Sequence, residues 1–147
     1  MKNLILKKAE KKNFEKIAKI YADEFSKPPY NEPWTLEKAK YKISCFSKYC
    51  EIWEIVCEDM LVGFVVVNPN QFFPGTIAFG EEIAIKEEFQ EKGIGTKVFK
   101  ELFNIYKRRN FKWFTGIALT RAKALKLYKK IGFNIEKEEV LISKKLN

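Results

Sequence analysis

One segment in the middle of the chain constrains the fold more than any other. The stretch 76–85 is rich in Ile and Ala and predicts a β-strand, and an amphipathic helix is predicted at 95–109. A further strand is predicted at 112–119. Two strands joined by a single helix pair in parallel, with a right-handed crossover. The chain therefore contains a β-α-β unit, with Gly93 and Gly95 where its helix begins.

These two glycines predict a binding site for a phosphate or pyrophosphate group. The start of a helix offers backbone N–H groups and the positive end of the helix dipole to an anion. Glycines let phosphate oxygens approach closely because they have no Cβ. Two common nucleotide motifs do not fit, since the dinucleotide motif needs glycine at Val98 and the P-loop motif needs lysine at Thr96. What remains is the pattern Gln90-x-x-Gly93-x-Gly95.

The other elements are predicted from hydrophobic periodicity and turn residues. Helices are expected at 14–25, capped by Asn13, and from the cap Thr35 to residue 47, with a proline-rich loop between them. Strands 51–58 and 61–68 predict an antiparallel hairpin. A strand at 4–7, a helix at 122–131 and two final strands near 133–137 and 139–145 complete the chain. The order β-α-α-β-β-β-α-β-α-β-β indicates one mixed α/β sheet with helices on both faces, in a single domain over residues 1–147.

Composition limits the chemistry and the partners. The chain has no histidine, which excludes a Ser-His-Asp triad and every histidine-containing zinc site, so we expect no metal. A net charge of +9 favours anionic partners. No apolar stretch is long enough to cross a bilayer and no secretory signal is evident, so we expect a cytoplasmic protein without membrane association.

Two motifs in the expected order resemble the GNAT superfamily of acetyl-CoA-dependent N-acetyltransferases. The pattern Gln90-x-x-Gly93-x-Gly95 is similar to motif A of that family. Downstream, residues 124–133 resemble its A-x-x-x-Y-x-x-x-G-F signature, with Tyr128 at the tyrosine. The resemblance implies the GNAT fold, with a mostly antiparallel central sheet, and acetyl-CoA as cofactor.

The resemblance also implies which residues hold the cofactor. The backbone of the strand that ends at Ile85 would pair with the pantetheine amides, and the glycine loop would surround the pyrophosphate. Arg121 stands where many members carry asparagine, and we expect it to reach a phosphate instead. The implied cofactor-binding residues are Ile83, Ile85, Gln90, Glu91, Lys92, Gly93, Ile94, Gly95, Thr96 and Arg121.

Acyl transfer to an amine needs a group that accepts a proton and a group that donates one. Tyr128 matches the general acid of the family, which would protonate the departing sulfur. Without histidine, the candidate bases are Glu82, which we favour, Glu81 and bulk solvent. Successive strand side chains face opposite sides, so only one of the two carboxylates is expected to face the cleft.

The acceptor is expected to be a primary amine of a small molecule or peptide, attacking directly in a ternary complex. Tyr30, Asn31 and Trp34, on the proline-rich loop, are candidate substrate-binding residues, although hydrophobic anchoring of the loop is the stronger explanation of the aromatic residues. Two other functions stay open: a basic nucleic-acid-binding module, which the scattered basic residues do not favour, and a GNAT-like domain that senses acyl-CoA without catalysis. The sequence also leaves open the acceptor and the oligomeric state, a homodimer included.

Overall fold

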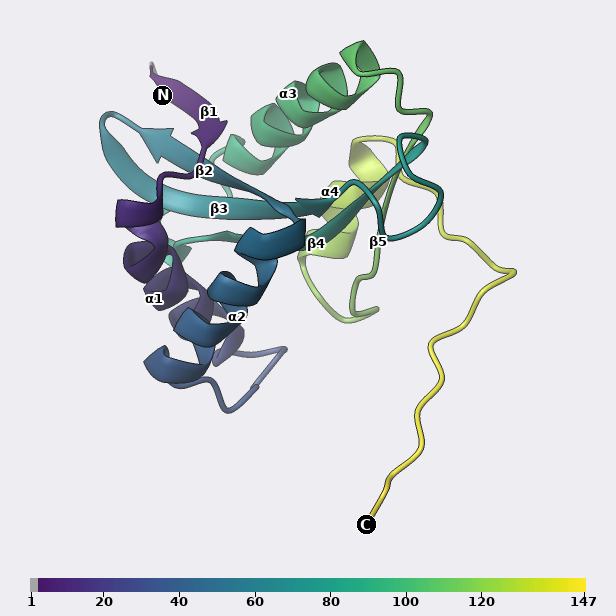
Figure 1. Cartoon of the computed structure of the whole chain (residues 1–147), viewed down its shortest axis with the longest axis horizontal. Helices are drawn as coiled ribbons and strands as arrows, with labels where there is room; N and C mark the ends of the chain where they lie inside the picture. The colour runs from purple at the N-terminus through teal and green to yellow at the C-terminus, as the bar shows by residue number, and fades with distance from the viewer. Residues whose placement is uncertain (1–2) are drawn as a thin grey trace.

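The computed structural model describes residues 3–147, and its centre is a five-stranded sheet (Figure 1). The strands lie in the order β1-β2-β3-β4-β5, and their bounds are Leu4–Lys8, Glu51–Cys57, Met60–Asn68, Ile77–Ile85 and Trp113–Gly116. β1 to β4 are antiparallel neighbours, and β5 runs parallel to β4. This confirms the predicted hairpin, the parallel β-α-β unit and the mixed, mostly antiparallel sheet.

Helices cover both faces of the sheet, as expected. α1 (Phe14–Phe25) and α2 (Leu36–Tyr49) lie on one face, and α3 (Ile94–Arg108) and α4 (Ala124–Lys130) lie on the other (Figure 1). Two short 3₁₀ turns, Lys11–Asn13 and Glu87–Phe89, precede α1 and follow β4. No helix within residues 3–147 is both long and apolar enough to cross a membrane.

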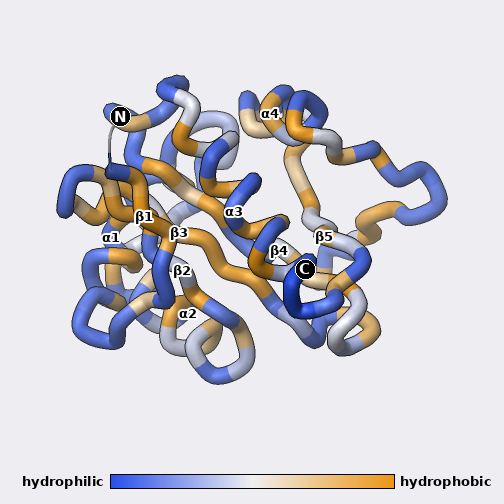
Figure 2. The backbone as a smooth tube through the Cα atoms, turned by 90° about the horizontal axis from the view of Figure 1, so that it is seen from above, coloured by the Kyte–Doolittle hydropathy of each residue, from blue (hydrophilic) through white to orange (hydrophobic). Residues whose placement is uncertain are grey.

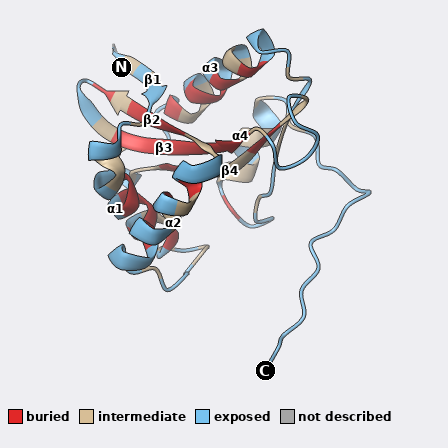
Figure 3. Cartoon of the chain, in the orientation of Figure 1, coloured by how far each residue is buried: buried red, intermediate tan, exposed pale blue. Residues whose placement is uncertain are grey.

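The sheet separates two hydrophobic cores, and β3 contributes to both. Phe64 and Val66 pack under α1 and α2, whereas Val65 and Val67 pack under α3. Because both faces of β3 are buried, its sequence is a nearly continuous apolar run. Figure 2 shows this concentration of hydrophobic residues along the central strands, and Figure 3 shows the same strands as the buried part of the molecule.

The two predicted final strands do not form. Residues 134–147 contain no helix or strand, and the chain beyond Phe133 runs away from the body of the molecule (Figures 1 and 3). Phe133 itself packs against the core on the α3 face of the sheet, with its ring centroid 6.2 Å from that of Phe114. The strand available for further pairing on this side, β5, has only four residues, and the segment leading to the second predicted strand is mostly charged. A strand of four residues offers few backbone hydrogen bonds to a neighbouring strand, too few to hold a mostly charged segment beside it.

The two predicted helix caps had different outcomes. The Thr35 hydroxyl accepts a hydrogen bond from the N–H of Lys38 at 3.2 Å, which confirms Thr35 as the cap of α2. Asn13 does not cap α1 with its side chain. Its Nδ2 instead donates to Oε1 of the buried Glu54 at 2.8 Å, so this side chain joins α1 to β2.

Candidate functional site

A gap between β4 and β5 is the geometric centre of the site. The parallel pairing of these strands begins at Ile77 and Trp113 and ends at Gly80 and Gly116. β4 then continues to Ile85 while staying paired with β3 on its other side. The last five residues of β4 therefore have one edge that β5 leaves uncovered.

The backbone groups of Ile83 and Ile85 face this uncovered edge. The N–H of Lys86 donates to the carbonyl of Val62 at 2.8 Å, toward β3. Along an extended strand, successive residues direct their N–H and C=O groups to opposite edges. Ile83 and Ile85 must therefore direct theirs into the gap, as the sequence predicted. The Ile85 carbonyl accepts a bond from Gln90 Nε2 at 2.7 Å, which leaves the Ile85 N–H as the donor directed into the gap.

A β-bulge places Glu81 and Glu82 on the same face of the sheet. Glu82 pairs with Val66 and Gly80 with Val67, so Glu81 is an extra residue in the ladder. Ala78 belongs to the core under α3, whereas Ala84 belongs to the core under α1 and α2, although six residues separate them. The alternation therefore reverses at the bulge. The expectation that only one carboxylate faces the cleft assumed a regularly alternating strand, and the bulge removes that assumption.

The two carboxylates have different partners. Glu82 Oε1 accepts a hydrogen bond from the Tyr21 hydroxyl at 3.0 Å, and Glu81 Oε1 accepts one from Asn68 Nδ2 at 3.3 Å. Burial raises the pKa of Glu82 to about 7 from its ordinary value of 4.5, against the lowering effect of the Tyr21 hydrogen bond. A carboxyl with such a pKa exchanges protons near neutral pH, as a general base needs to do.

The start of α3 has the geometry that the glycine pattern predicted for an anion. Gly93, the N-cap, has φ +80°, and the position that its Cβ would occupy has no other atom within 4 Å. A side chain there would enter this open space and strain the backbone. The first N–H groups of an α-helix have no acceptor within the helix, so the start of α3 also offers donors to an anion. Gly93 thus fits a phosphate or pyrophosphate cradle.

Gly95 has a different reason to be glycine. A Cβ on Gly95 would lie 2.7 Å from Leu127 Cδ2 and 3.9 Å from Ile85 Cδ1. The missing side chain therefore lets α4 pack against the first turn of α3. The sequence argument assigned this glycine to phosphate approach, whereas its nearest neighbour is a leucine of α4.

The other residues of the loop surround this helix start in different ways. Gln90 Nε2 also donates to Glu24 Oε1 at 2.9 Å and so links the loop to α1. Glu91, at φ +57°, has its carboxylate 3.9 Å from Lys123 Nζ, and Lys92 Nζ lies 5.7 Å from the centre of the Phe89 ring. Ile94 is a buried core residue, so only its backbone can reach an anion, whereas Thr96 is half-buried.

Tyr128 lies on the α3 and α4 side of the gap. Its ring packs edge-on against Phe99 and Phe133, with centroids 5.5 Å and 5.6 Å away. Burial raises the pKa of the Tyr128 phenol, and nearby Tyr30 and Glu82 act in the same direction. The charge of Glu82 thus acts on the pKa of Tyr128, although the two residues belong to opposite layers of the fold.

The predicted acceptor residues divide into anchoring and exposed groups. Tyr30 packs against Phe25 with ring centroids 4.9 Å apart, and Trp34 packs edge-on against Tyr21 at 4.6 Å. Both rings thus anchor the loop to the core under α1, the alternative that the sequence left open. Trp34 also lines two surface cavities, of about 400 Å³ and 1130 Å³. Asn31 is exposed, with φ +50°.

Arg121 connects the two layers across the site. Its Nη2 donates to the backbone carbonyl of Pro29 at 3.2 Å, so the segment before α4 contacts the loop between α1 and α2. The predicted contact of this side chain with a phosphate stays a prediction, and in the structure the guanidinium lies against the loop.

Sequence reasoning missed Tyr21 and Glu24 as neighbours of the site. Tyr21 was assigned only to the buried face of its helix, because its spacing matched that face. The spacing gives the direction of a side chain but not the partner of its hydroxyl. Glu24 is half-buried beside Gln90, and no sequence pattern connects residues so far apart in the chain.

Solved structures confirm the fold. A possible acetyltransferase from Clostridium difficile 630 superposes with a TM-score of 0.81 at 11% identity, covering 98% of this chain and 99% of the other. An aminoglycoside N-acetyltransferase in complex with CoA superposes with a TM-score of 0.76 at 11% identity, covering 99% of this chain and 96% of the other. A ribosomal-protein-alanine N-acetyltransferase from Brucella melitensis biovar Abortus 2308 superposes with a TM-score of 0.73 at 15% identity, covering 97% of this chain and 100% of the other.

The family assignment rests on the sequence itself. A search of curated proteins found no match. The sequence model of the Acetyltransferase (GNAT) family matches residues 14–133, which include α1, the glycine loop, Glu82 and Tyr128. This chain therefore belongs to the GNAT family of acetyltransferases.

Proposed function

We propose that the chain transfers an acetyl group from acetyl-CoA to a primary amine of a small molecule or peptide, by direct attack in a ternary complex. The observation that carries the proposal is the gap between β4 and β5. The edge of β4 that carries Ile83 and Ile85 is uncovered there, and the charge of Glu82 acts on the pKa of Tyr128, which supports a shared site for the proposed base and acid. Family membership supports acetyl transfer in general.

The residues of the gap and the loop fit the parts of this cofactor. Acetyl-CoA supplies an acetyl group activated as a thioester. The backbone of Ile83 and Ile85 would bind its pantetheine arm as an added strand. The N–H groups at the start of α3, with Gly93, would hold the pyrophosphate. The Ile85 N–H would polarise the thioester carbonyl.

The two proton transfers are assigned to opposite sides of the gap. An ammonium group must lose a proton before its nitrogen can attack, and Glu82 is the proposed acceptor of that proton. As the new C–N bond forms and the C–S bond breaks, Tyr128 would donate a proton to the sulfur. The raised pKa of Tyr128 keeps its phenol protonated at neutral pH, the form that this role requires.

The charge around Glu82 favours a cationic acceptor. Glu32 and Glu81 both raise the pKa of Glu82, against Lys42, so negative charge collects around this residue in a chain of net charge +9. Such a site attracts protonated amines. Among the solved structures of similar fold are an aminoglycoside and a ribosomal-protein-alanine N-acetyltransferase, so both antibiotic-like and peptide amines are reasonable acceptors to test.

The test is a screen for acetyl-CoA-dependent thiol release across polyamines, aminoglycosides, amino acids and peptide N-termini. A thermal-shift assay with saturating acetyl-CoA accompanies it. At a hundredfold excess over the dissociation constant, we expect the melting temperature to rise by roughly 8–10 °C. No stabilisation by acetyl-CoA would contradict the proposal. Stabilisation without thiol release for any amine would favour a sensing domain.

A further inference from the structure

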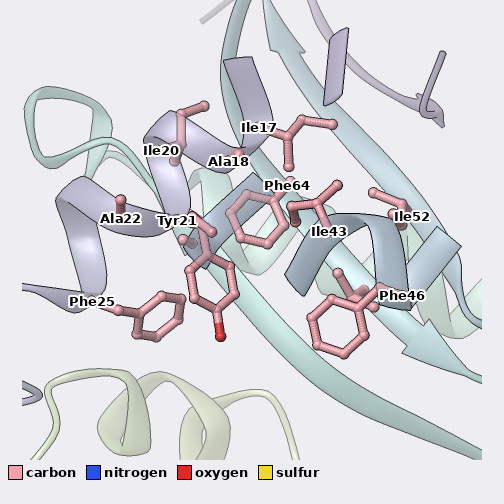
Figure 4. Close-up of a cluster of buried hydrophobic side chains, with 13 residues drawn as sticks. Ile17, Ala18, Ile20, Tyr21, Ala22, Phe25, Ile43, Phe46, Ile52 and Phe64 are labelled. Carbon is pink, nitrogen blue, oxygen red and sulfur yellow. The ribbon is translucent and has the colours of Figure 1, made fainter. Parts of the chain in front are cut away.

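Tyr21 is held in one orientation by aromatic neighbours on three sides. It is 2% exposed, and its ring centroid lies 4.8 Å from that of Phe25, 4.6 Å from Trp34 and 5.8 Å from Phe64. Figure 4 shows its ring between those of Phe25 and Phe64, with the hydroxyl oxygen directed out of the cluster. A ring packed in this way presents its hydroxyl at a fixed place.

That hydroxyl is directed at the proposed base. It donates to Glu82 Oε1 at 3.0 Å, which joins α1 to the bulged part of β4. A buried carboxylate needs such a donor, because burial otherwise favours its protonated form. A donor that remains protonated over the working pH range stabilises the carboxylate without titrating itself, and burial raises the pKa of Tyr21 well above its ordinary value.

The other groups around Glu82 do not replace this donor. Lys42 of α2 acts in the same direction as Tyr21, but more weakly. Glu32 from the loop after α1 and Glu81 from β4 oppose it. The two remaining neighbours, Tyr30 of the loop and Tyr128 of α4, are phenols whose own pKa values Glu82 raises.

We propose that Tyr21 is a positioning residue for the acyl-transfer reaction, because it holds the Glu82 carboxylate at the gap in the form that accepts a proton. This inference rests on the proposed function, in which Glu82 is the base. It assigns to α1 a direct part in the chemistry at the gap, in addition to its packing.

The test measures the titration of Glu82 by NMR, in a protein labelled with ¹³C at the glutamate carboxyls. The Glu82→Gln variant identifies which signal belongs to Glu82. Tyr21→Phe keeps the ring and removes only the donor. Since a hydrogen bond to a charged group is typically equivalent to one or two pKa units, we expect the midpoint of Glu82 to rise by about one pH unit. An unchanged or lower midpoint overturns the inference.

Tyr106→Phe is the matched control. Tyr106 is also 2% exposed, and its hydroxyl donates to a carboxylate, Glu51 Oε1, at 2.8 Å, away from the gap. This variant should leave the midpoint of Glu82 unchanged; an equal shift in it would show a general effect of packing and overturn the inference. If Tyr21→Phe does not fold, Tyr21→Met, which also lacks a donor and has a flexible apolar side chain, gives the same comparison.

Kinetics separate this inference from the proposed function. In Tyr21→Phe, the acidic limb of the pH profile of kcat/KM should move up by the same roughly one pH unit, with KM for acetyl-CoA unchanged. If Glu82→Gln keeps wild-type activity and its pH profile, the assignment of Glu82 as base fails. If Glu82→Gln is inactive and Tyr21→Phe has the wild-type profile, only the role of Tyr21 fails.

Discussion

Gly95 of α3 faces Leu127 of α4 so closely that a Cβ on Gly95 would lie 2.7 Å from Leu127 Cδ2. Leu127 precedes Tyr128, so this contact positions the proposed acid relative to the loop that would hold the cofactor. The two family motifs are therefore in direct contact, although about thirty residues separate them in the sequence.

Gly95→Ala should push α4 away from α3. We expect a loss of about 1–3 kcal/mol in the free energy of unfolding, measured with urea, because an added methyl in a packed contact forces its neighbours to move. Turnover should fall as well, since Tyr128 moves with α4. Lys100→Ala, on the exposed side of α3, is the control and should change neither quantity. Wild-type stability in Gly95→Ala would show that Leu127 relaxes without consequence.

Gly93 and Gly75 allow the effect of the backbone to be separated from that of the cofactor. Both are glycines with a positive φ, +80° and +76°, and neither has an atom within 4 Å of the position that a Cβ would occupy. Alanine at either position should destabilise the fold by about 1–2 kcal/mol, because the left-handed conformation is unfavourable for a side chain. Only Gly93→Ala should also weaken binding of acetyl-CoA, measured by calorimetry. Equal affinities in the two variants would count against the cradle.

Tyr128→Phe tests the proposed acid. The ring contacts with Phe99 and Phe133 do not need the hydroxyl, so the fold and the affinity for acetyl-CoA should be unchanged. Turnover should fall by about a hundredfold, the lower end of the range for a general acid. The measurement is steady-state thiol release, with calorimetry of acetyl-CoA beside it. Undiminished turnover would remove Tyr128 from the mechanism.

Glu82 makes stability depend on pH in the direction opposite to a salt-bridged carboxylate. Its pKa is about 7 in the folded chain and near 4.5 when unfolded, so the folded state binds more protons between these values. Stability contributed by the protonated group is complete below about pH 4.5 and is lost as the pH rises toward 7.

Glu82→Gln should therefore be more stable than wild type above neutral pH and equal to it in acid. We expect a difference of about 2 kcal/mol in the free energy of unfolding at about pH 8, which disappears at about pH 4. Glu101→Gln, an exposed change on α3, should show no such dependence. An equal difference in the free energy of unfolding between Glu82→Gln and wild type at both pH values would indicate that Glu82 does not titrate in this range.

The sequence predicted the elements up to α4 because the informative patterns are local. Alternation and helical spacing located β2, β3 and α3 to within about two residues, and the glycine pattern located the start of α3. What it could not predict depends on contacts between distant segments. The bulge at Glu81 arises from pairing with β3, and the hydroxyl of Tyr21 finds its partner sixty-one residues away.

The two predicted final strands, which do not form, show the same dependence on distant segments. Residues 139–145 have a strand-like composition, but a strand exists only where a neighbour offers a ladder. Their side chains at Val140, Leu141 and Ile142 are about 80% exposed in the structure. A segment can thus have the composition of a strand and still form none, because no neighbouring strand pairs with it.

Asn13 gives the sharpest test of a misassigned local signal. As a helix cap, it would accept a hydrogen bond, and aspartate would serve equally well. In the structure, its Nδ2 donates to Glu54 Oε1 at 2.8 Å, and Glu54 is 1% exposed. Asn13→Asp replaces that donor with a second carboxylate beside a buried one, and we expect it to lose about 2–3 kcal/mol in the free energy of unfolding at neutral pH.

Thr35→Asp is the matched control, because Thr35 caps α2 through an oxygen that accepts from the N–H of Lys38. Aspartate keeps that acceptor, so this variant should stay within about 0.5 kcal/mol of wild type. Since protonation of the carboxylate introduced by Asn13→Asp would restore a donor to Glu54, the deficit of that variant should shrink as the pH falls toward about 4. Equal stability of the two variants at neutral pH would mean that Asn13 acts as an ordinary cap in solution.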